Sequence, residues 1–163
     1  MDYIHDIRQA IGPRKIILNA ATTIIEKDGR ILLQRRSDNG KWGLIGGLME
    51  INETYQETAI REVREETGLE VKLDSFLGIF HNHNMVWSSG DQAHVVTAFF
   101  TASIVRGTPR IDEESYELRF FDRDEMPELF AEDHRTALEA YFAGVRYPLL
   151  RENSYQSNVV GTE

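Results

Sequence analysis

The sequence contains no cysteine, which excludes disulfide bonds and zinc sites built on thiolates. It also lacks an excess of positive charge, because 27 Asp and Glu residues outnumber 18 Lys and Arg residues and leave a formal net charge of −9. Binding to nucleic acid through the phosphate backbone needs clustered Lys and Arg, so this balance disfavours a sequence-independent nucleic-acid-binding protein. A small anionic ligand reached through a bound metal ion is compatible with it.

No stretch of about 18 consecutive apolar residues occurs, so the sequence predicts no membrane-spanning helix. The N-terminus, MDYIHDIRQAIGPRK, lacks the apolar core of a signal peptide, and we expect a cytoplasmic protein. A chain of 163 residues, 41% hydrophobic and 28% charged, is typical of a globular protein with one sizeable core. We therefore expect a single domain over residues 1–163, with a core over about 17–145, an N-terminal extension over 1–16 and a C-terminal tail over 146–163.

The most informative stretch runs from residue 47 to residue 69 and reads GLMEINETYQETAIREVREETGL. Its Asn and Thr residues followed by acids are helix-start signals, so we expect a helix that begins near Thr54. Gly68 suits the left-handed position after the last turn, where a Cβ atom would be strained. At about 100° per residue, Glu62, Glu65 and Glu66 share one face of that helix, beside an apolar stripe. A solvated acidic helix would explain these charges but not the flanking glycines.

The shared acidic face has a chemical consequence. Carboxylates placed close together repel one another, so ionising three of them without a cation is costly. A hard divalent cation that prefers oxygen ligands removes the conflict, and the expected cofactor is therefore Mg²⁺ or Mn²⁺. This pattern favours metal-assisted chemistry on a phosphate group.

The same stretch resembles the Nudix box, G-x5-E-x7-R-E-U-x-E-E-x-G-U with U aliphatic, at every specified position. Upstream, residues 42–47 read WGLIGG and are similar to the W-x-L-P-G-G segment of that family, with Ile45 where proline is frequent. The chain thus resembles a Nudix hydrolase. The resemblance implies an α/β fold in which an α/β/α sandwich surrounds a mixed β-sheet and carries a loop-helix-loop catalytic motif.

The resemblance also implies roles for single residues. The metal ligands would be the carboxylates of Glu62, Glu65 and Glu66 together with the backbone carbonyl of Gly46. Glu53 and Arg61 would form an orienting pair. In several members a box glutamate is the general base, and Glu62 is the positional match, whereas other members use a glutamate from a later loop.

A further acid near the metal ions is expected from residues 111–121, IDEESYELRFF, which resemble a Nudix region with that role. Glu114 is the first choice for this metal-binding acid and Glu113 is the alternative. A solvated acidic loop is the other interpretation of the stretch.

Arginine and tryptophan residues outside the box are candidates for contact with the substrate. Residues 32–36, LLQRR, resemble the L-L-x-x-R stretch of the family, so Arg35 or Arg36 is expected to hold a diphosphate through paired hydrogen bonds. Solvated arginines at a strand edge are the alternative. Trp87 and Trp42 could stack on a nucleobase, although a core or an interface is the ordinary place of a tryptophan.

The remaining pattern predicts strands over 16–25 and 30–34 joined by a turn at Asp28–Gly29, then strands over 70–81, 93–106 and 118–121, and a last helix over 133–142. His81 and His83 would share one face of a continuing strand, because side chains alternate with period two. They could contact a base, a phosphate or a metal ion, but half-buried polar groups at a strand end are more common.

Substrate selectivity in this family lies outside the box. We expect a small nucleoside diphosphate linked to another moiety, with ADP-ribose first and a dinucleoside polyphosphate second. The alternatives are an RNA 5′-pyrophosphohydrolase and a non-catalytic nucleotide-sensing module, although such modules typically lack box carboxylates that are all present here. Residues 3–11 and 147–160 extend beyond the expected core and favour a homodimer, unless they pack on their own subunit or are mobile.

Overall fold

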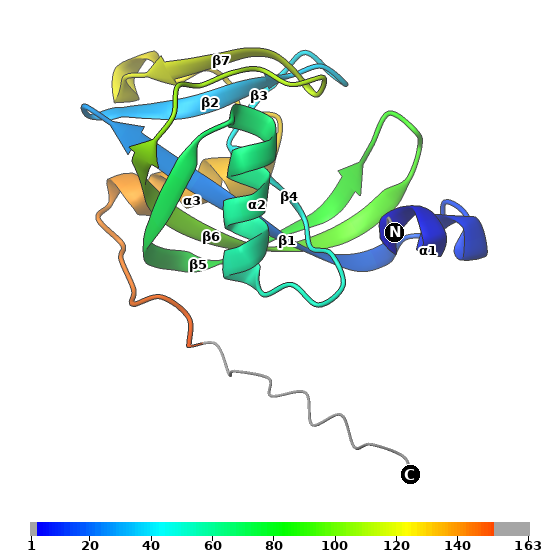
Figure 1. The fold of residues 1–163 in the computed structure, drawn as a ribbon. Coiled ribbons are helices and arrows are strands. Elements are labelled where there is room, and N and C mark those ends of the chain that lie inside the picture. The colour runs from blue at the N-terminus through cyan, green and yellow to red at the C-terminus, as the bar shows by residue number, and fades with distance from the viewer. Residues whose placement is uncertain (1–2, 152–163) are drawn as a thin grey trace.

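Seven strands and three α-helices follow one another along residues 3–151, which are the residues that the structure, a computed structural model, describes (Figure 1). In chain order the elements are α1 (Tyr3–Ile11), β1 (Ile16–Lys27), β2 (Arg30–Arg36), β3 (Trp42–Gly43), β4 (Ile45–Leu48), α2 (Tyr55–Thr67), β5 (Glu70–Val86), β6 (Gln92–Arg106), β7 (Ser115–Phe121), a short 3-10 helix (Arg123–Glu125) and α3 (Glu132–Phe142). No helix among these residues is long and apolar enough to cross a membrane.

The strands form one mixed sheet in the order β3-β2-β1-β6-β5, with β4 paired to β1 and β7 paired to β2. Only the β1–β6 pair is parallel among the described strand pairs. The long strand β1 is central, because it pairs with β6 over residues 16–25, with β4 over residues 20–23 and with β2 through its last two residues. The mixed sheet that the resemblance implied is therefore confirmed.

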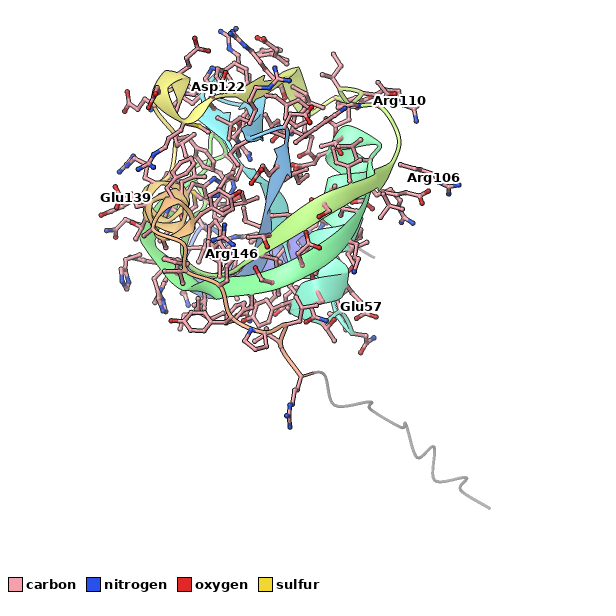
Figure 2. All side chains as sticks on the ribbon, turned by 90° about the vertical axis from the view of Figure 1, so that its left-hand side faces the viewer. Glu57, Arg106, Arg110, Asp122, Glu139 and Arg146 are labelled. Carbon is pink, nitrogen blue, oxygen red and sulfur yellow. The ribbon has the colours of Figure 1, made fainter. Side chains whose placement is uncertain are left out.

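Helices α2 and α3 cover opposite faces of the sheet. Consecutive residues of a strand point to opposite faces, and this alternation separates two packed layers. Ile24 and Phe99 pack with Ala137 of α3, whereas Phe100 packs with Ala59 of α2. Figure 2 shows the charged side chains of residues such as Arg106, Asp122 and Glu139 on the outside of these layers. The α/β/α sandwich follows from this two-sided burial.

Local sequence accounts for both ends of α2. The hydroxyl of Thr54 accepts a hydrogen bond from the Glu57 N–H at 3.2 Å, and the Glu57 carboxylate accepts one from the Thr54 N–H at 2.8 Å. This reciprocal capping box satisfies two N–H groups that a helix start leaves unpaired. Gly68 ends the helix with φ 69°, and its N–H donates to the Arg64 carbonyl. Both predicted ends of the helix are confirmed.

Three regions differ from the sequence-based expectation. Residues 3–11 form a helix where only an N-terminal extension was expected, β5 continues to Val86 instead of ending at residue 81, and β7 begins at Ser115 instead of residue 118. The extension begins with three polar residues, Asn82, His83 and Asn84, which interrupt the apolar pattern, but β5 still pairs with β6 as far as the Val86–Gln92 pair. His81 and His83 lie on one face of this extension, as predicted, with their rings stacked 5.6 Å apart.

The beginning of the C-terminal tail packs on its own subunit. Tyr147 exchanges two backbone hydrogen bonds with Phe76 of β5, at 2.9 and 2.8 Å. Residues 152–160, which make up most of the C-terminal segment on which the homodimer prediction was based, lie outside the described residues.

Candidate active site

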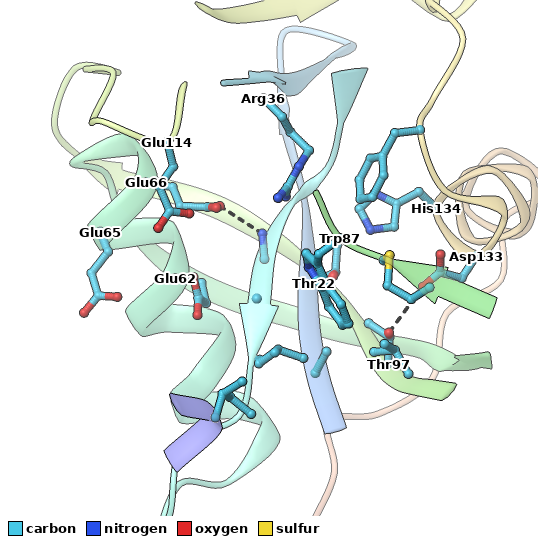
Figure 3. Close-up of a pocket in the computed structure, with 18 of the residues that line it drawn as sticks. Thr22, Arg36, Glu62, Glu65, Glu66, Trp87, Thr97, Glu114, Asp133 and His134 are labelled. Atoms are coloured by element: carbon cyan, nitrogen blue, oxygen red, sulfur yellow. Dashed lines mark hydrogen bonds between the residues drawn. The ribbon is translucent and has the colours of Figure 1, made fainter. Parts of the chain in front are cut away.

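A cavity of about 400 Å³ lies between α2 and the beginning of α3 (Figure 3). Its walls include residues of β1 and β6, namely Ala20, Thr22, Val95 and Thr97. The α2 side carries the predicted glutamates, and the other side carries Trp87, Phe130, Asp133 and His134. One cavity therefore combines an acidic side with a side that carries aromatic rings and two further polar residues.

Two glycines of β4 allow the acidic helix to approach the sheet closely. A Cβ atom at Gly46 would stand 2.4 Å from the Ala21 carbonyl oxygen, and one at Gly47 would stand 2.4 Å from a carboxylate oxygen of Glu62. The Gly46 N–H also donates to the Glu66 carboxylate at 3.1 Å. The absence of side chains at Gly46 and Gly47 thus allows β4 to lie against the sheet and the glutamates.

We expect Gly47→Ala to give a folded protein with activity lowered by roughly 10- to 100-fold, a loss of the size that misplacement of a catalytic group by about 1 Å produces. The added methyl meets the end of a flexible side chain, so Glu62 can swing aside, but it then leaves its place in the cavity. Steady-state kinetics and thermal unfolding would measure the two effects. Gly40→Ala is the control that separates lost stability from lost activity: its φ of 69° makes the added Cβ strained, so it should melt lower, but Gly40 does not line the cavity and the variant should keep normal activity. Normal activity of Gly47→Ala would contradict the assigned position of Glu62.

Arg61 is the counter-ion of three box carboxylates. Its Nε and Nη2 donate to the two oxygens of Glu53 at 2.6 and 2.9 Å, and its Nη1 donates to Glu62 at 2.7 Å and to Glu65 at 3.1 Å. A further bond reaches the Leu48 carbonyl at 3.1 Å. The structure therefore joins Glu53 and Arg61 as the resemblance implied, and it ties the pair to β4 as well as to the acidic face.

The Glu53–Arg61 pair predicts a pH dependence of stability. The Arg61 guanidinium lowers the pKa of the Glu53 carboxyl from 4.5 to about 2. Because the folded pKa lies below the unfolded one, ionised Glu53 stabilises the fold above pH 4.5, and this contribution is lost as the pH falls towards 2. We expect the difference in melting temperature between wild type and Glu53→Gln to be constant above about pH 5 and to shrink below it.

The control for this titration is Glu139→Gln, an exposed acid on α3 (Figure 2). Its melting temperature should follow that of the wild type at every pH. A Glu53→Gln difference that stays constant down to pH 2.5 would contradict the assigned pair, because the shifted titration falls in that window.

Burial dominates the electrostatics of the acidic face. The side chain of Glu66 is only 3% exposed, and burial followed by repulsion from Glu62 raises its pKa to about 8. Burial also raises the pKa of Glu62. Such carboxylates are costly to ionise without a nearby cation.

The residues present fit a divalent cation. Oxygen donors from Glu62, Glu65 and Glu66 suit Mg²⁺ or Mn²⁺, and within residues 3–151 the buried carboxyl of Glu66 accepts one hydrogen bond, from the Gly46 N–H. No three His, Asp or Glu side chains of the described residues stand in a ready-made metal-binding arrangement. The reason is visible in the hydrogen bonds, because Arg61 holds Glu62 and Glu65 while Glu66 turns towards β4.

The sequence left two choices open, between Arg35 and Arg36 and between Glu113 and Glu114, and the structure places one residue of each pair at the cavity. Arg36 lines the cavity, and its guanidinium donates to Asp38 at 2.9 and 3.0 Å and stacks on Phe130. Arg35 donates to the Gly40 carbonyl instead and does not line the cavity. Likewise Glu114 lines it beside Glu66 and Glu113 does not.

Of the two tryptophans and the two histidines that the sequence offered as ligand contacts, one tryptophan lines the cavity. Trp87 lines the cavity, while Trp42 packs edge-on against Phe121 with ring centroids 4.8 Å apart. The rings of His81 and His83 face His94 and do not line the cavity. Of these side chains, only Trp87 is placed to contact a ligand in the cavity.

Sequence reasoning did not identify three cavity residues on the side opposite the glutamates: Thr97, Asp133 and His134. An Asp and a His near a helix start carry no distinctive local signal, because acids in a first turn ordinarily complement the helix dipole. Asp133 and His134 precede the buried residues Ala137, Leu138 and Tyr141 by one helical turn or two, and this spacing is typical of the inward face of a helix. Only the tertiary structure brings that face to the cavity.

Comparison with known proteins agrees with this arrangement. The chain matches the NUDIX domain family model over residues 16–141, which include all the cavity-lining residues except Ile4. It is 35% identical over 125 residues to an ADP-ribose pyrophosphatase from Methanocaldococcus jannaschii, covering 75% of this chain and 71% of that protein. It is 32% identical over 130 residues to a MutT-like protein from Streptomyces ambofaciens, covering 80% and 79%. A solved NUDIX hydrolase from Nitrosomonas europaea has a TM-score of 0.68 at 26% identity, covering 83% of this chain and 97% of that one.

Proposed function

Because the chain belongs to the Nudix family and is a pyrophosphohydrolase, we propose that it acts in the cytoplasm as a divalent-metal-dependent enzyme on ADP-ribose or a closely similar nucleoside diphosphate linked to another moiety. The observation that carries the proposal is the two-sided cavity, with clustered glutamates towards α2 and Trp87 and Asp133 towards α3. A diphosphate suits the first side and a nucleoside suits the second.

In this proposal Mg²⁺ or Mn²⁺, held by Glu62, Glu65, Glu66, the Gly46 carbonyl and Glu114, supplies charge neutralisation for the diphosphate and lowers the pKa of water. Arg36 holds non-bridging phosphate oxygens through its guanidinium. Glu53 acts through Arg61, whose position on Glu62 and Glu65 it fixes with two hydrogen bonds.

The reaction itself needs one proton acceptor. Water attacks a phosphorus atom of the diphosphate, a new P–O bond forms, and the bridging P–O bond breaks with its electron pair on the leaving phosphate. Glu62 takes the proton of the attacking water in our proposal, because its carboxylate lines the cavity next to Gly47 of β4 and it is the positional match to the base of several family members. With ADP-ribose the products are AMP and ribose 5-phosphate.

The preference for ADP-ribose is supported by the relative from Methanocaldococcus jannaschii, whose name is ADP-ribose pyrophosphatase. It is also compatible with the shape of the cavity, whose α3 side offers the Trp87 ring for stacking and polar groups for the edge of a base. The small volume of about 400 Å³ fits a small nucleotide.

The test is a product-release panel with Mg²⁺ or Mn²⁺ and ADP-ribose, diadenosine polyphosphates, NADH, nucleoside triphosphates and 5′-triphosphorylated RNA as substrates. We expect the highest kcat/KM with ADP-ribose and no turnover in the presence of a chelator. Preferential turnover of the RNA or of a dinucleoside polyphosphate would replace the proposed substrate, and metal-independent turnover would overturn the proposed cofactor.

We also propose that the enzyme is a homodimer. Ile17 and Ile51 are 68% and 63% exposed and lie with Tyr3 around one surface depression, and clustered exposed apolar side chains mark association surfaces. Analytical ultracentrifugation at micromolar concentration should give the dimer mass for the wild type and the monomer mass for Ile17→Asp combined with Ile51→Asp. A monomeric wild type would exclude the dimer.

A further inference from the structure

The N-terminal helix α1 contributes to the wall of the active-site cavity. Among the described residues, Ile4 is the one that lines the cavity and lies outside the part of the chain matched by the family model. Ile4 packs on the same buried cluster as Leu48 of β4 and Trp87, and the members of that cluster are Leu18, Ala20, Ala93 and Val95. The wall at α1 is therefore an addition of this chain to the matched domain.

A second cavity of about 280 Å³ lies next to this wall. Three side chains line both cavities: Ile4, Leu48 and Trp87. These three side chains form a partition, because each of them borders the space on both sides. The second cavity is otherwise lined by Leu18 and by residues of α1 and of the turn between β5 and β6, namely Arg8, Ser88, Ser89 and Asp91. Without the partition the two cavities would join.

Arg8 holds α1 to the beginning of β6. Its Nη2 donates to the Gln92 carbonyl at 2.8 Å, and its Nε lies 3.5 Å from the Asp91 carboxylate. Its Nη1 donates to the carbonyls of Gly12 and Arg14, at 3.3 and 2.7 Å, which follow the last turn of α1. The helix has no fully buried residue, so apolar burial alone would hold it weakly. The position of α1 on the same side of the molecule as the turn between β5 and β6 (Figure 1) therefore depends on Arg8.

We propose that α1 limits the length of the ligand that the active-site cavity accepts, with Ile4 as a specificity-determining residue and Arg8 as the positioning residue that keeps the helix in place. This inference rests on the proposed function and deepens it. ADP-ribose carries a ribose beyond its diphosphate, whereas a diadenosine polyphosphate carries further phosphates and a second nucleoside. The cavity of about 400 Å³ suits the smaller ligand, and the space behind the partition would admit the larger one.

The chemistry of the partition adds to its bulk. Ile4 and Leu48 have no hydrogen-bonding groups in their side chains, so a phosphate or sugar pressed against them would lose water without gaining a partner. Exclusion of the longer ligand therefore combines a steric clash with a cost of desolvation, which is how a binding site discriminates against a competitor. A helix with a purely structural role would change the stability of the protein and not its selectivity.

The experiment measures the ratio of kcat/KM for diadenosine tetraphosphate to kcat/KM for ADP-ribose, with Mg²⁺ present. Ile4→Ala should raise this ratio about 10-fold or more, the size of the discrimination that a few carbon atoms in a pocket provide. Arg8→Met should also raise it, because methionine keeps the apolar part of the side chain but removes the bonds that hold α1. The full-length protein is used throughout.

Two matched substitutions serve as controls. Ile7→Ala removes the same side chain one turn further along α1, but Ile7 lines neither cavity. Arg14→Met removes an exposed guanidinium that lines neither cavity. Both variants should keep the wild-type ratio.

Fluorescence provides a readout that is independent of turnover. Trp42→Phe leaves Trp87 as the single tryptophan of the chain. In this background, Arg8→Met should increase the quenching of Trp87 by acrylamide, because the neighbouring side of α1 no longer covers the partition. Arg14→Met should leave the quenching unchanged.

The outcomes separate this inference from the proposed function. A ratio that stays within about threefold of the wild type in both Ile4→Ala and Arg8→Met would overturn the limit on ligand length and leave ADP-ribose hydrolysis in place, and a lower melting temperature in these variants would then assign α1 a structural role. An equal rise in Ile7→Ala would overturn the specific role of Ile4. No turnover of ADP-ribose by the wild type would overturn the proposed substrate, while the quenching of Trp87 would still decide whether Arg8 holds α1 at the cavity.

Discussion

Glu66→Gln is expected to lower kcat by about 10²- to 10³-fold or more, the size of the effect when one group that stabilises transition-state charge is removed. Glu66 is buried against β4, and its carboxylate is the least exposed of the three on the acidic face. Steady-state kinetics with a saturating divalent cation would measure the loss. The substitution removes an ionisable carboxyl from the proposed metal-binding group but keeps an oxygen for the Gly46 N–H.

The melting temperature of Glu66→Gln shows whether a loss of activity comes from a lost catalytic group or from a disturbed fold. Because burial raises the pKa of Glu66 to about 8, the metal-free wild type resembles the neutral amide at pH 7, and we expect an equal or higher melting temperature for Glu66→Gln without metal. Added Mg²⁺ should raise the melting temperature of the wild type and not that of the variant, since a ligand stabilises only the state that binds it. Glu70→Gln, an exposed acid on β5, should behave as wild type in both assays. Near-normal turnover of Glu66→Gln would remove this residue from the metal site.

Arg61→Met is expected to lower the free energy of unfolding by about 2–3 kcal/mol in metal-free buffer. Breaking a buried ion pair costs about 3–5 kcal/mol, and partial exposure of the groups around Arg61 reduces this value. Methionine keeps the apolar length of the side chain, so the loss reports the charge and its hydrogen bonds to three carboxylates. Urea unfolding measured by fluorescence would give the free energy.

The same substitution at Arg106 provides the control. Arg106 also binds a glutamate, Glu70, but its side chain is 74% exposed and projects from the surface (Figure 2). We expect Arg106→Met to cost less than about 1 kcal/mol. Mg²⁺ should restore part of the stability of Arg61→Met, because the cation replaces the missing positive charge. Equal losses at the two positions would contradict the assignment of Arg61 as the counter-ion of the acidic face.

Several site residues could be predicted because their chemistry is local. Glu62, Glu65 and Glu66 share a face by helical spacing alone, and the spacing of Glu53 and Arg61 across the helix start brings the two side chains together. The choice between Arg35 and Arg36 could not be made from local spacing. Consecutive strand residues face opposite ways, so one of the two had to point towards the cavity, but which one depends on the pairing of β2 with β7, where the register shifts between the two arginines.

By itself, the sequence determined the helix of residues 55–67, its capped ends, its acidic face and the family to which the chain belongs, because these depend on residues close together in the chain. Tertiary structure alone decided what stands opposite that face. The parallel pairing of β1 with β6 and the packing of α3 on the face of the sheet opposite α2 bring Thr97, Asp133 and His134 to the cavity that the glutamates line. Contacts between residues so distant in sequence depend on the packing of the whole core, and no local pattern specifies them.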